Sequence, residues 1–244
     1  MKILVCVKAI AESRTSESSK DVRMNRFDEF ALEQALIICQ SRKESRVDVI
    51  SAGTDKAAPI LTRAMGMGAD HGIHILMPEI PFPDPFFTAS LIAEYAKNKE
   101  YDLILTGIMS EDLMQAQTGG MIAEILSIPC TASVISAQVS KEKIFIEREI
   151  GTGTRESWEL CLPALLTVQT GLNKPRYPSL SRMLWAARQE IEIIKAKTLN
   201  PPAVLQIVTG TAMPEKQRSG IVLKGSLEQK AVKLMQLFKD KGFL

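Results

Sequence analysis

The feature that most constrains the fold is an alternation of short apolar segments with amphipathic segments over the first 134 residues. The apolar segments are continuous runs, typical of strands buried on both faces of a parallel sheet, and the amphipathic ones have helical periodicity. Chains with this alternation form a parallel sheet covered by helices on both faces. The sequence therefore predicts an α/β fold with a doubly wound, mainly parallel sheet. The expected strands span residues 2–8, 47–53, 71–76 and 102–107, and the expected helices span residues 28–40, 55–67, 84–98 and 115–127.

The pattern changes after about residue 133. Alternating polar and apolar residues at 143–150 and 157–168 predict a strand meander that continues the sheet or caps its edge. Two consecutive prolines follow residue 200 and mark a boundary. We therefore expect an α/β domain over residues 1–200 and a C-terminal arm over residues 201–244.

The arm contains one clear helix, from Ser226 to about Asp240. Ser226 and Gln229 have the spacing of a capping box, and Val232 and Met235 belong to an apolar face. Such a helix either packs back on its own domain or reaches onto a partner protein, and the residues alone leave both possibilities open.

The composition bounds the classes of function. A formal net charge of +2 over 244 residues gives no support for broad attraction to nucleic acid or membranes, which needs concentrated basic surface. No apolar run reaches the ~18 residues of a spanning helix, and the N-terminal run has the pattern of a first strand rather than a signal peptide. We therefore expect a cytoplasmic protein. A polar stretch at residues 12–20 is expected to form a mobile surface loop.

Cysteine and histidine residues do not have the spacing of a metal site. The four cysteines lie among apolar residues without a CxxC pair, so we expect buried free thiols. The two histidines, His71 and His74, are three residues apart in a predicted strand and would face opposite sides of the sheet. The cysteines are Cys6, Cys39, Cys130 and Cys161.

A nucleotide-sized site is expected beyond the carboxyl ends of the predicted strands, where ligands bind in open parallel sheets. The last of these ends leads through residues 107–120 into a helix start that contains Gln115, Gln117, Thr118 and Gly119. Backbone N–H groups, neutral side chains and a glycine at a helix start suit a monophosphate without a metal, although the same pattern also fits a simple capped helix. The chain has no dinucleotide or ATPase glycine fingerprint and no recognisable catalytic constellation, which favours a carrier or binding role.

The segment 171–180, GLNKPRYPSL, follows an apolar strand and is the most distinctive run in the chain. Its two prolines exclude a regular helix or a central strand and favour a stiff, extended loop. The loop carries Arg176 and Tyr177 and ends at Leu180. Such a loop is suited to docking on another protein; the alternative is a proline-rich turn without a partner.

Several segments, in the same order over nearly the whole chain, resemble the β subunits of electron transfer flavoproteins. They are KILVCVK, MNRFDEFALEQAL, VISAG, AMGMGAD, DLILTG, QTG, EREI and PALLTVQTGLNKPRYPSL. The resemblance implies a Rossmann-like fold of the adenine nucleotide α-hydrolase-like kind and a structural AMP. It also implies a heterodimer with an α subunit that carries the redox FAD. Such a carrier, which is not itself an enzyme, takes electrons from a flavin dehydrogenase of the acyl-CoA dehydrogenase type and passes them to a quinone reductase or a similar acceptor.

The resemblance also assigns sites by position. It implies that Leu180 anchors the dehydrogenase within a recognition loop at about residues 171–185, with Arg176 and Tyr177 as further contacts. It implies that Glu149 pairs with the flavin domain of the α subunit and that residues 201–244 pack on that subunit. The implied AMP contacts are Cys6, Asn25, Arg26, Phe27, Asp28, Ala52, Gly107, Asp112, Gln115, Ala116, Gln117 and Thr118.

The sequence departs from the family pattern at several positions. Arg26 replaces a proline, Ile108 and Met109 replace a lysine and a glutamine, and Trp185 replaces a lysine, which indicates a specialised partner. Two other interpretations stay open. One is an electron-bifurcating subunit with a second FAD in place of AMP, against which the QTG and FDEFALEQAL segments speak. The other is a stand-alone module that binds an adenine nucleotide, against which the long tail and the proline-rich loop speak.

Overall fold

The structure is a computed structural model that describes residues 1–11, 22–80, 83–210, 212 and 220–243. The polar stretch at 12–20, expected as a mobile loop, lies outside the described residues. The chain divides into two units, Met1–Ile207 and Val208–Leu244. Each unit is described by itself below.

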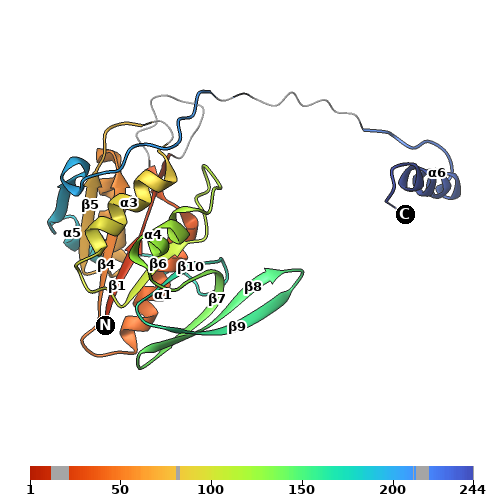
Figure 1. The fold of residues 1–244 in the computed structure, drawn as a ribbon. Coiled ribbons are helices and arrows are strands. Elements are labelled where there is room, and N and C mark those ends of the chain that lie inside the picture. Colours follow the sequence, from red (N-terminus) through yellow and green to blue (C-terminus); the bar gives the residue numbers. More distant parts are fainter. Residues whose placement is uncertain (12–21, 81–82, 211, 213–219, 244) are drawn as a thin grey trace. The chain divides into compact units, whose positions relative to one another are not determined.

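The first unit is built on a sheet in which the described residues form nine strands, in the order β11-β5-β4-β1-β6-β10-β7-β8-β9 (Figure 1). Neighbours from β11 to β7 are parallel, and β8 and β9 continue the sheet as an antiparallel meander. The predicted α/β architecture, mainly parallel with a meander, is therefore confirmed. The strands are β1 (Lys2–Cys6), β4 (Arg46–Gly53), β5 (His71–Leu76), β6 (Leu103–Gly107), β7 (Cys130–Ser140), β8 (Lys143–Gly151), β9 (Thr154–Cys161), β10 (Ala164–Val168) and β11 (Ile191–Lys195), and a separate ribbon pairs β2 (Ala9–Ala11) with β3 (Val22–Met24).

Helices cover both faces of the sheet. Three pack on one face: α1 (Arg26–Gln40), α2 (Ala58–Met67) and α5 (Leu180–Ala186). Two pack on the other face: α3 (Pro85–Ala96) and α4 (Thr118–Leu126). Short 3₁₀ turns occur at Asp55–Ala57 and Ala196–Leu199.

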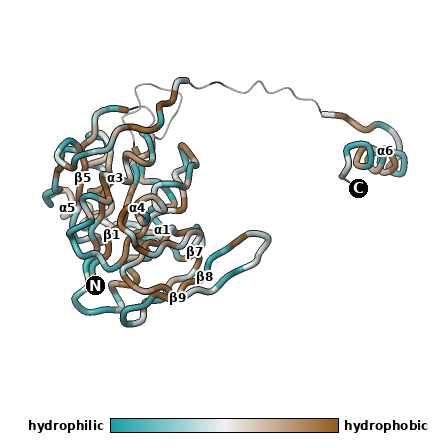
Figure 2. Tube along the Cα trace, viewed as in Figure 1, coloured by the Kyte–Doolittle hydropathy of each residue, from teal (hydrophilic) through white to brown (hydrophobic). Residues whose placement is uncertain are grey.

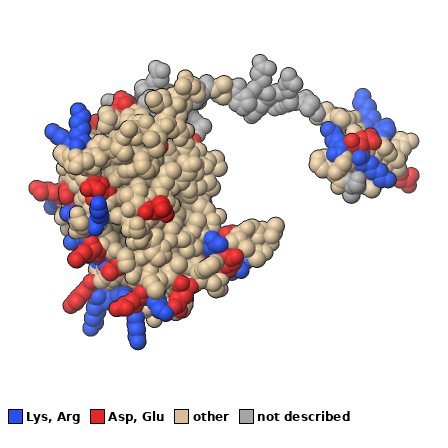
Figure 3. All heavy atoms as spheres, in the orientation of Figure 1, with Lys and Arg blue, Asp and Glu red and all other residues tan. Residues whose placement is uncertain are grey.

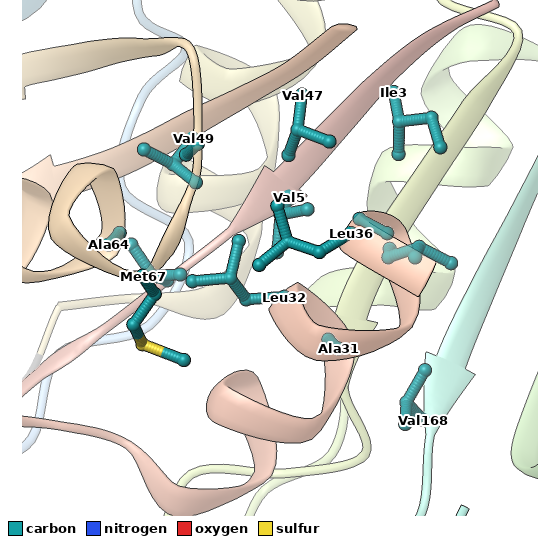
Figure 4. Packing of buried hydrophobic residues seen from close by; sticks show 14 of the residues in the cluster. Ile3, Val5, Ala31, Leu32, Leu36, Val47, Val49, Ala64, Met67 and Val168 are labelled. Atoms are coloured by element: carbon teal, nitrogen blue, oxygen red, sulfur yellow. The ribbon is translucent and has the colours of Figure 1, made fainter. Parts of the chain in front are cut away.

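The core explains why the central strands are apolar throughout. On one face Leu32 and Leu36 of α1, four residues apart, pack toward Val5 and Val47 (Figure 4), and on the other face Leu4 belongs to the cluster beneath α3 and α4. Consecutive residues of β1 are thus buried on opposite sides, and the strands at the centre of the unit are apolar in Figure 2. Burying a side chain of this size stabilises the fold by roughly 1.5–3 kcal/mol.

Several element boundaries differ from the sequence prediction by one to three residues, and two of these differences lie where β1 ends and α4 begins. The first strand ends at Cys6 rather than at residue 8, because the backbone N–H of Lys8 donates to the Asp28 side chain at 2.8 Å. The fourth helix begins at Thr118 rather than at residue 115, because Met114 and Ala116 have positive φ angles of 53° and 52°. A left-handed backbone cannot belong to a right-handed helix.

The prediction that all the cysteines are buried is wrong for Cys130 and Cys161. Both are exposed, because they lie at the start of β7 and the end of β9, where the meander leaves the helical cover. The histidines do lie apart, as expected: His71 contacts Glu192, whereas His74 is buried and contacts the carbonyl oxygens of Gly53 and Thr54.

The second unit contains α6 (Leu227–Asp240). The capping box is confirmed: the Ser226 hydroxyl accepts a hydrogen bond from the Gln229 N–H, and the Ser226 N–H donates to the Gln229 side chain. Lysines lie on α6 in Figure 3, and its apolar residues are exposed as well. Across the described chain, no helix has both the length and the apolar character needed to cross a membrane. The exposed apolar residues of α6 include Leu227, Val232, Leu234, Met235 and Phe238.

Candidate functional site

A cleft opens at the carboxyl ends of β1, β4 and β6, where the parallel-sheet rule predicts a ligand. Including the part that opens to solvent, its volume is about 810 Å³. The structure places nine of the twelve expected cofactor residues around this cleft. They are Cys6, Asn25, Asp28, Ala52, Gly107, Gln115, Ala116, Gln117 and Thr118.

Asp28 holds the floor of the cleft together. Its buried carboxylate accepts hydrogen bonds from the backbone N–H of Lys8 at 2.8 Å, the N–H of Gly107 at 3.1 Å and the side-chain amide of Asn25 at 2.9 Å. A Cβ atom at Gly107 would lie 2.4 Å from the Asp28 carboxylate and 2.6 Å from the Phe27 Cβ. Only glycine fits at this point, and Asp28 thereby joins the ends of β1 and β6 to the first turn of α1.

The acid and the thiol beneath the cleft are both shifted toward their neutral forms. Burial raises the pKa of Asp28 to about 7, against the opposing effect of its hydrogen bonds. Burial, followed by the nearby Asp28 charge, raises the pKa of the Cys6 thiol. Because the thiolate is the nucleophilic form, Cys6 serves here as an apolar wall.

The three remaining expected residues lie beside the cleft rather than in its lining. Arg26 is exposed, and its backbone N–H donates to Glu111 at 3.0 Å. Phe27 packs against Gly107, as its close approach to that glycine shows. Asp112 forms an ion pair with Lys8 at 2.8 Å. These residues fasten the loop 108–117 to β1 and α1, so they support the lining without belonging to it.

The end of this loop forms a cradle of backbone N–H groups. Ala116 is left-handed, and Gln117 after it is right-handed, which is the alternation that turns successive N–H groups toward one anion. The first N–H groups of α4 have no acceptor within the helix, and the helix dipole adds positive potential at this end. At Gly119 a Cβ would lie 2.8 Å from the Thr106 hydroxyl, so the helix start sits directly on the end of β6.

Sequence reasoning missed the wall that α3 supplies. Pro85, Thr88 and Ile92 line the cleft, and α3 is positioned by Asp84, whose carboxylate caps the helix at the Phe86 N–H. The signal was available, because the capped helix after β5 must begin at the same sheet edge as the other strand ends. What the sequence lacked was the fact that α3 and α4 share one face.

The proline-rich loop at 171–179 lies beside α1 and α2 and leads into α5. Ser179 caps that helix by accepting a hydrogen bond from the Arg182 N–H. Tyr177 is 86% exposed and Leu180 is 77% exposed, whereas the Arg176 guanidinium is paired with Glu33 of α1. Glu149, the remaining expected contact, is exposed on β8 of the meander.

Comparisons with known proteins agree with this geometry. A family model described as "Electron transfer flavoprotein domain" matches residues 14–199. The chain belongs to the electron transfer flavoprotein family. The protein named "Electron transfer flavoprotein subunit beta" from Methylophilus methylotrophus is 30% identical to this chain over 98% of both chains. The human protein of that name is 29% identical over 97% of this chain and 98% of its own length, and the Bos taurus protein is 31% identical over 88% and 84%.

The residues that line the cleft determine which kind of ligand it can bind. Its lining combines the neutral side chains of the loop end and the apolar surfaces of Cys6, Ala52 and Ile92 with the ionisable Lys8 and Asp28. Among the described residues, no group of three His, Cys, Asp or Glu side chains could hold a metal ion. The arrangement can therefore hold a ligand that has both an anionic and an apolar part.

Proposed function

We propose that this chain is the β subunit of a heterodimeric electron transfer flavoprotein that holds AMP in its cleft. In this proposal the subunit pairs with an α subunit and carries electrons from a flavin dehydrogenase of the acyl-CoA dehydrogenase type to a quinone reductase or a similar acceptor. The observation that carries the proposal is the cleft at the strand ends, with an N–H cradle at the start of α4, in a chain of this family.

The residues present fit AMP. Its phosphate matches the N–H groups from Ala116 to the first turn of α4, together with the neutral side chains of Gln115, Gln117 and Thr118. Its adenine matches the apolar surfaces of Cys6, Ala52 and Ile92. Because AMP takes part in no electron transfer, its contribution is to join the loop 108–117 to the strand ends.

The α subunit would be bound by two exposed features of this chain. Glu149 on β8 would pair with the flavin domain of that subunit, and the apolar face of α6 would pack on its surface. FAD, held mainly by the α subunit, would supply the electron transfer chemistry when bound. We place the complex in the cytoplasm.

The dehydrogenase would dock at residues 171–185. Tyr177 and Leu180 support this assignment because they are large, amphipathic or apolar side chains that a folded chain otherwise tends to cover. A protein pocket on the donor would take up the Leu180 side chain.

The experiment that tests the proposal is the identification of nucleotides released from the purified complex. The chain would be produced with its α partner, denatured, and the released molecules quantified by chromatography and mass spectrometry. One AMP and one FAD per heterodimer are expected, and the chain purified alone should be colourless. Two FAD molecules would replace the AMP assignment with an electron-bifurcating subunit, and an adenine nucleotide bound to a chain that forms no complex would indicate a stand-alone module.

A further inference from the structure

Arg176 lies in the exposed proline-rich loop, yet its side chain turns inward. Its Nε and Nη2 atoms each donate to Glu33 at 2.8 Å, to Oε2 and Oε1 respectively. The backbone N–H of Arg176 donates to the same carboxylate at 3.0 Å. Arg176 therefore makes three hydrogen bonds to one acid that lies 143 positions earlier in the chain.

Glu33 is committed to this contact by its burial. Its side chain is only 6% exposed, and a carboxylate taken out of water is unfavourable unless it is paired and hydrogen-bonded. The two parallel bonds from the planar guanidinium fix both distance and orientation, which a lysine would not do. The pair thus holds the loop in one position relative to α1.

Two neighbouring contacts fasten the same loop. The Asn173 side-chain amide donates to the Phe30 carbonyl of α1 at 3.0 Å. The Arg63 guanidinium of α2 lies 5.0 Å from the centre of the Tyr177 ring. The loop is therefore tied to α1 and α2, while Tyr177 and Leu180 remain largely exposed.

We propose that Glu33 is a positioning residue for partner docking: through Arg176 it holds the loop in the form that the partner dehydrogenase binds. The inference rests on the proposed function, in which the loop docks the dehydrogenase. A loop that is ordered before binding loses less freedom on association. If the pair is broken, the competent loop is only a fraction of the population and the apparent affinity falls by that fraction. Electron transfer within the docked complex is not changed.

A first test measures loop opening without any dehydrogenase. Trypsin cleaves after arginine but not before proline, so Arg176 is a cleavage point in the middle of the loop, whereas Lys174, which precedes Pro175, is not. In the intact heterodimer with Glu33→Gln, cleavage after Arg176, followed by mass spectrometry, should be about tenfold faster than in wild type. Cleavage after Arg42, outside the loop, serves as the internal control and should be unchanged. An unchanged rate after Arg176 overturns the inference.

A second test measures steady-state reduction of the heterodimer by a purified acyl-CoA dehydrogenase and its acyl-CoA substrate. Glu33→Gln should raise the KM for the flavoprotein about tenfold and leave kcat, FAD content and AMP content at wild-type values. Arg176→Lys, which retains the charge but not the paired geometry, should give a smaller rise in KM. Because Arg176→Lys keeps a positive charge beside the buried Glu33, this variant keeps the test decisive should Glu33→Gln fail to fold. A wild-type KM in folded Arg176→Lys and Arg176→Gln overturns the inference.

Leu180→Ala distinguishes the positioning role of Glu33 from the docking of the dehydrogenase by the loop, on which that role rests. If Leu180→Ala raises KM but the Glu33 and Arg176 variants do not, docking by the loop stands and the positioning role is wrong. If neither set changes KM while trypsin opens the Glu33→Gln loop, the loop is positioned as inferred but does not dock the dehydrogenase, which overturns the docking proposal and the role that rests on it.

Discussion

Two loops leave neighbouring strands at the same edge of the sheet, and α1 holds both through a buried acid. The loop after β6 is held by Asp28, which accepts hydrogen bonds from two backbone N–H groups and one side-chain amide. The loop after β10 is held by Glu33, which binds a guanidinium. Asp28 therefore acts mainly on backbone N–H groups, whereas Glu33 acts mainly on a side chain and accepts only one backbone N–H besides, that of Arg176.

The difference follows what each loop presents. The loop after β6 offers its own N–H groups, so its backbone must be fixed, and it uses Gly107 and the left-handed Met114 and Ala116 to achieve this. The loop after β10 carries Tyr177 and leads to Leu180 at the start of α5, and it is held mainly through the side chains of Arg176 and Asn173. The loop after β6 is thus held mainly by hydrogen bonds to backbone N–H groups, whereas the loop after β10 is held mainly by hydrogen bonds from side chains.

Removing Asp28 should give the largest loss of stability. Asp28→Ala leaves the N–H groups of Lys8 and Gly107 and the Asn25 amide without their acceptor, and each buried unpaired group costs about 1–3 kcal/mol. We expect the free energy of unfolding, measured by urea denaturation, to fall by roughly 3 kcal/mol or more. Asn173→Ala, which removes two side-chain hydrogen bonds from the other loop, to the Phe30 carbonyl and the Gln34 side chain, is the matched control and should cost less, about 1–2 kcal/mol. Equal losses in the two variants would contradict the distinction between the loops.

Removing Leu180 should affect docking and nothing else. Burial of one such side chain in a partner is worth roughly 1.5–3 kcal/mol, and ~1.4 kcal/mol is a factor of ten. Leu180→Ala should therefore weaken electron uptake from the dehydrogenase by about tenfold or more in steady-state reduction assays. FAD content and heterodimer assembly should stay at wild-type levels, and loss of FAD in this variant would show that Leu180 is not an anchor.

Changing the helix start should affect the nucleotide and not the docking loop. Thr118→Glu places a negative charge and additional bulk at the start of α4, where the N–H groups face the cleft, and a charge at a helix end is worth about 0.3–2 kcal/mol. AMP content, measured after denaturation of the complex, should fall, and heterodimer stability should fall with it. Thr118→Ser keeps the hydroxyl and should retain AMP, and full AMP occupancy in Thr118→Glu would rule out the site.

A further effect is a pH dependence that comes from Asp28. Its pKa is about 7 in the folded chain and about 3.9 when unfolded, so the folded state binds more protons between these values. The stabilisation is fully present below about pH 4 and is lost as the pH rises through 7. The difference in unfolding free energy between wild type and Asp28→Asn should fall by up to ~1.4 kcal/mol per pH unit in this window. Urea denaturation at several pH values measures this difference. If it grows with pH, folding lowers the pKa of Asp28 instead of raising it.

Local pattern predicted the sheet and much of the cleft, but not the contacts between distant residues. The strand-end rule pointed to Gly107 and the helix start after it, and the family resemblance added Cys6 and Ala52; all three line the cleft. The pairing of Arg176 with Glu33 could not be found in this way, since it joins positions 143 apart that share no local pattern. Sequence reasoning therefore treated Arg176 as an outward contact.

Backbone conformation and exposure were harder still to predict. The left-handed Met114 and Ala116 shorten the predicted helix, and neither is a residue type that signals such a backbone. Cys130 and Cys161 lie among apolar neighbours and yet are exposed, because exposure at a strand end depends on which element covers it. Both cases depend on packing between elements, which periodicity does not encode.

The design of α6 has a consequence for how this protein must be synthesised. The capping box starts the helix from contacts within residues 226–229, so the helix needs no partner to begin. Its apolar residues, Leu227, Val232 and Met235 among them, are exposed once it has formed. A newly synthesised chain therefore exposes an apolar surface that can associate with other chains. Under the proposed function, matched production of the two subunits keeps that surface covered, and surplus copies would be the ones that aggregate or are degraded.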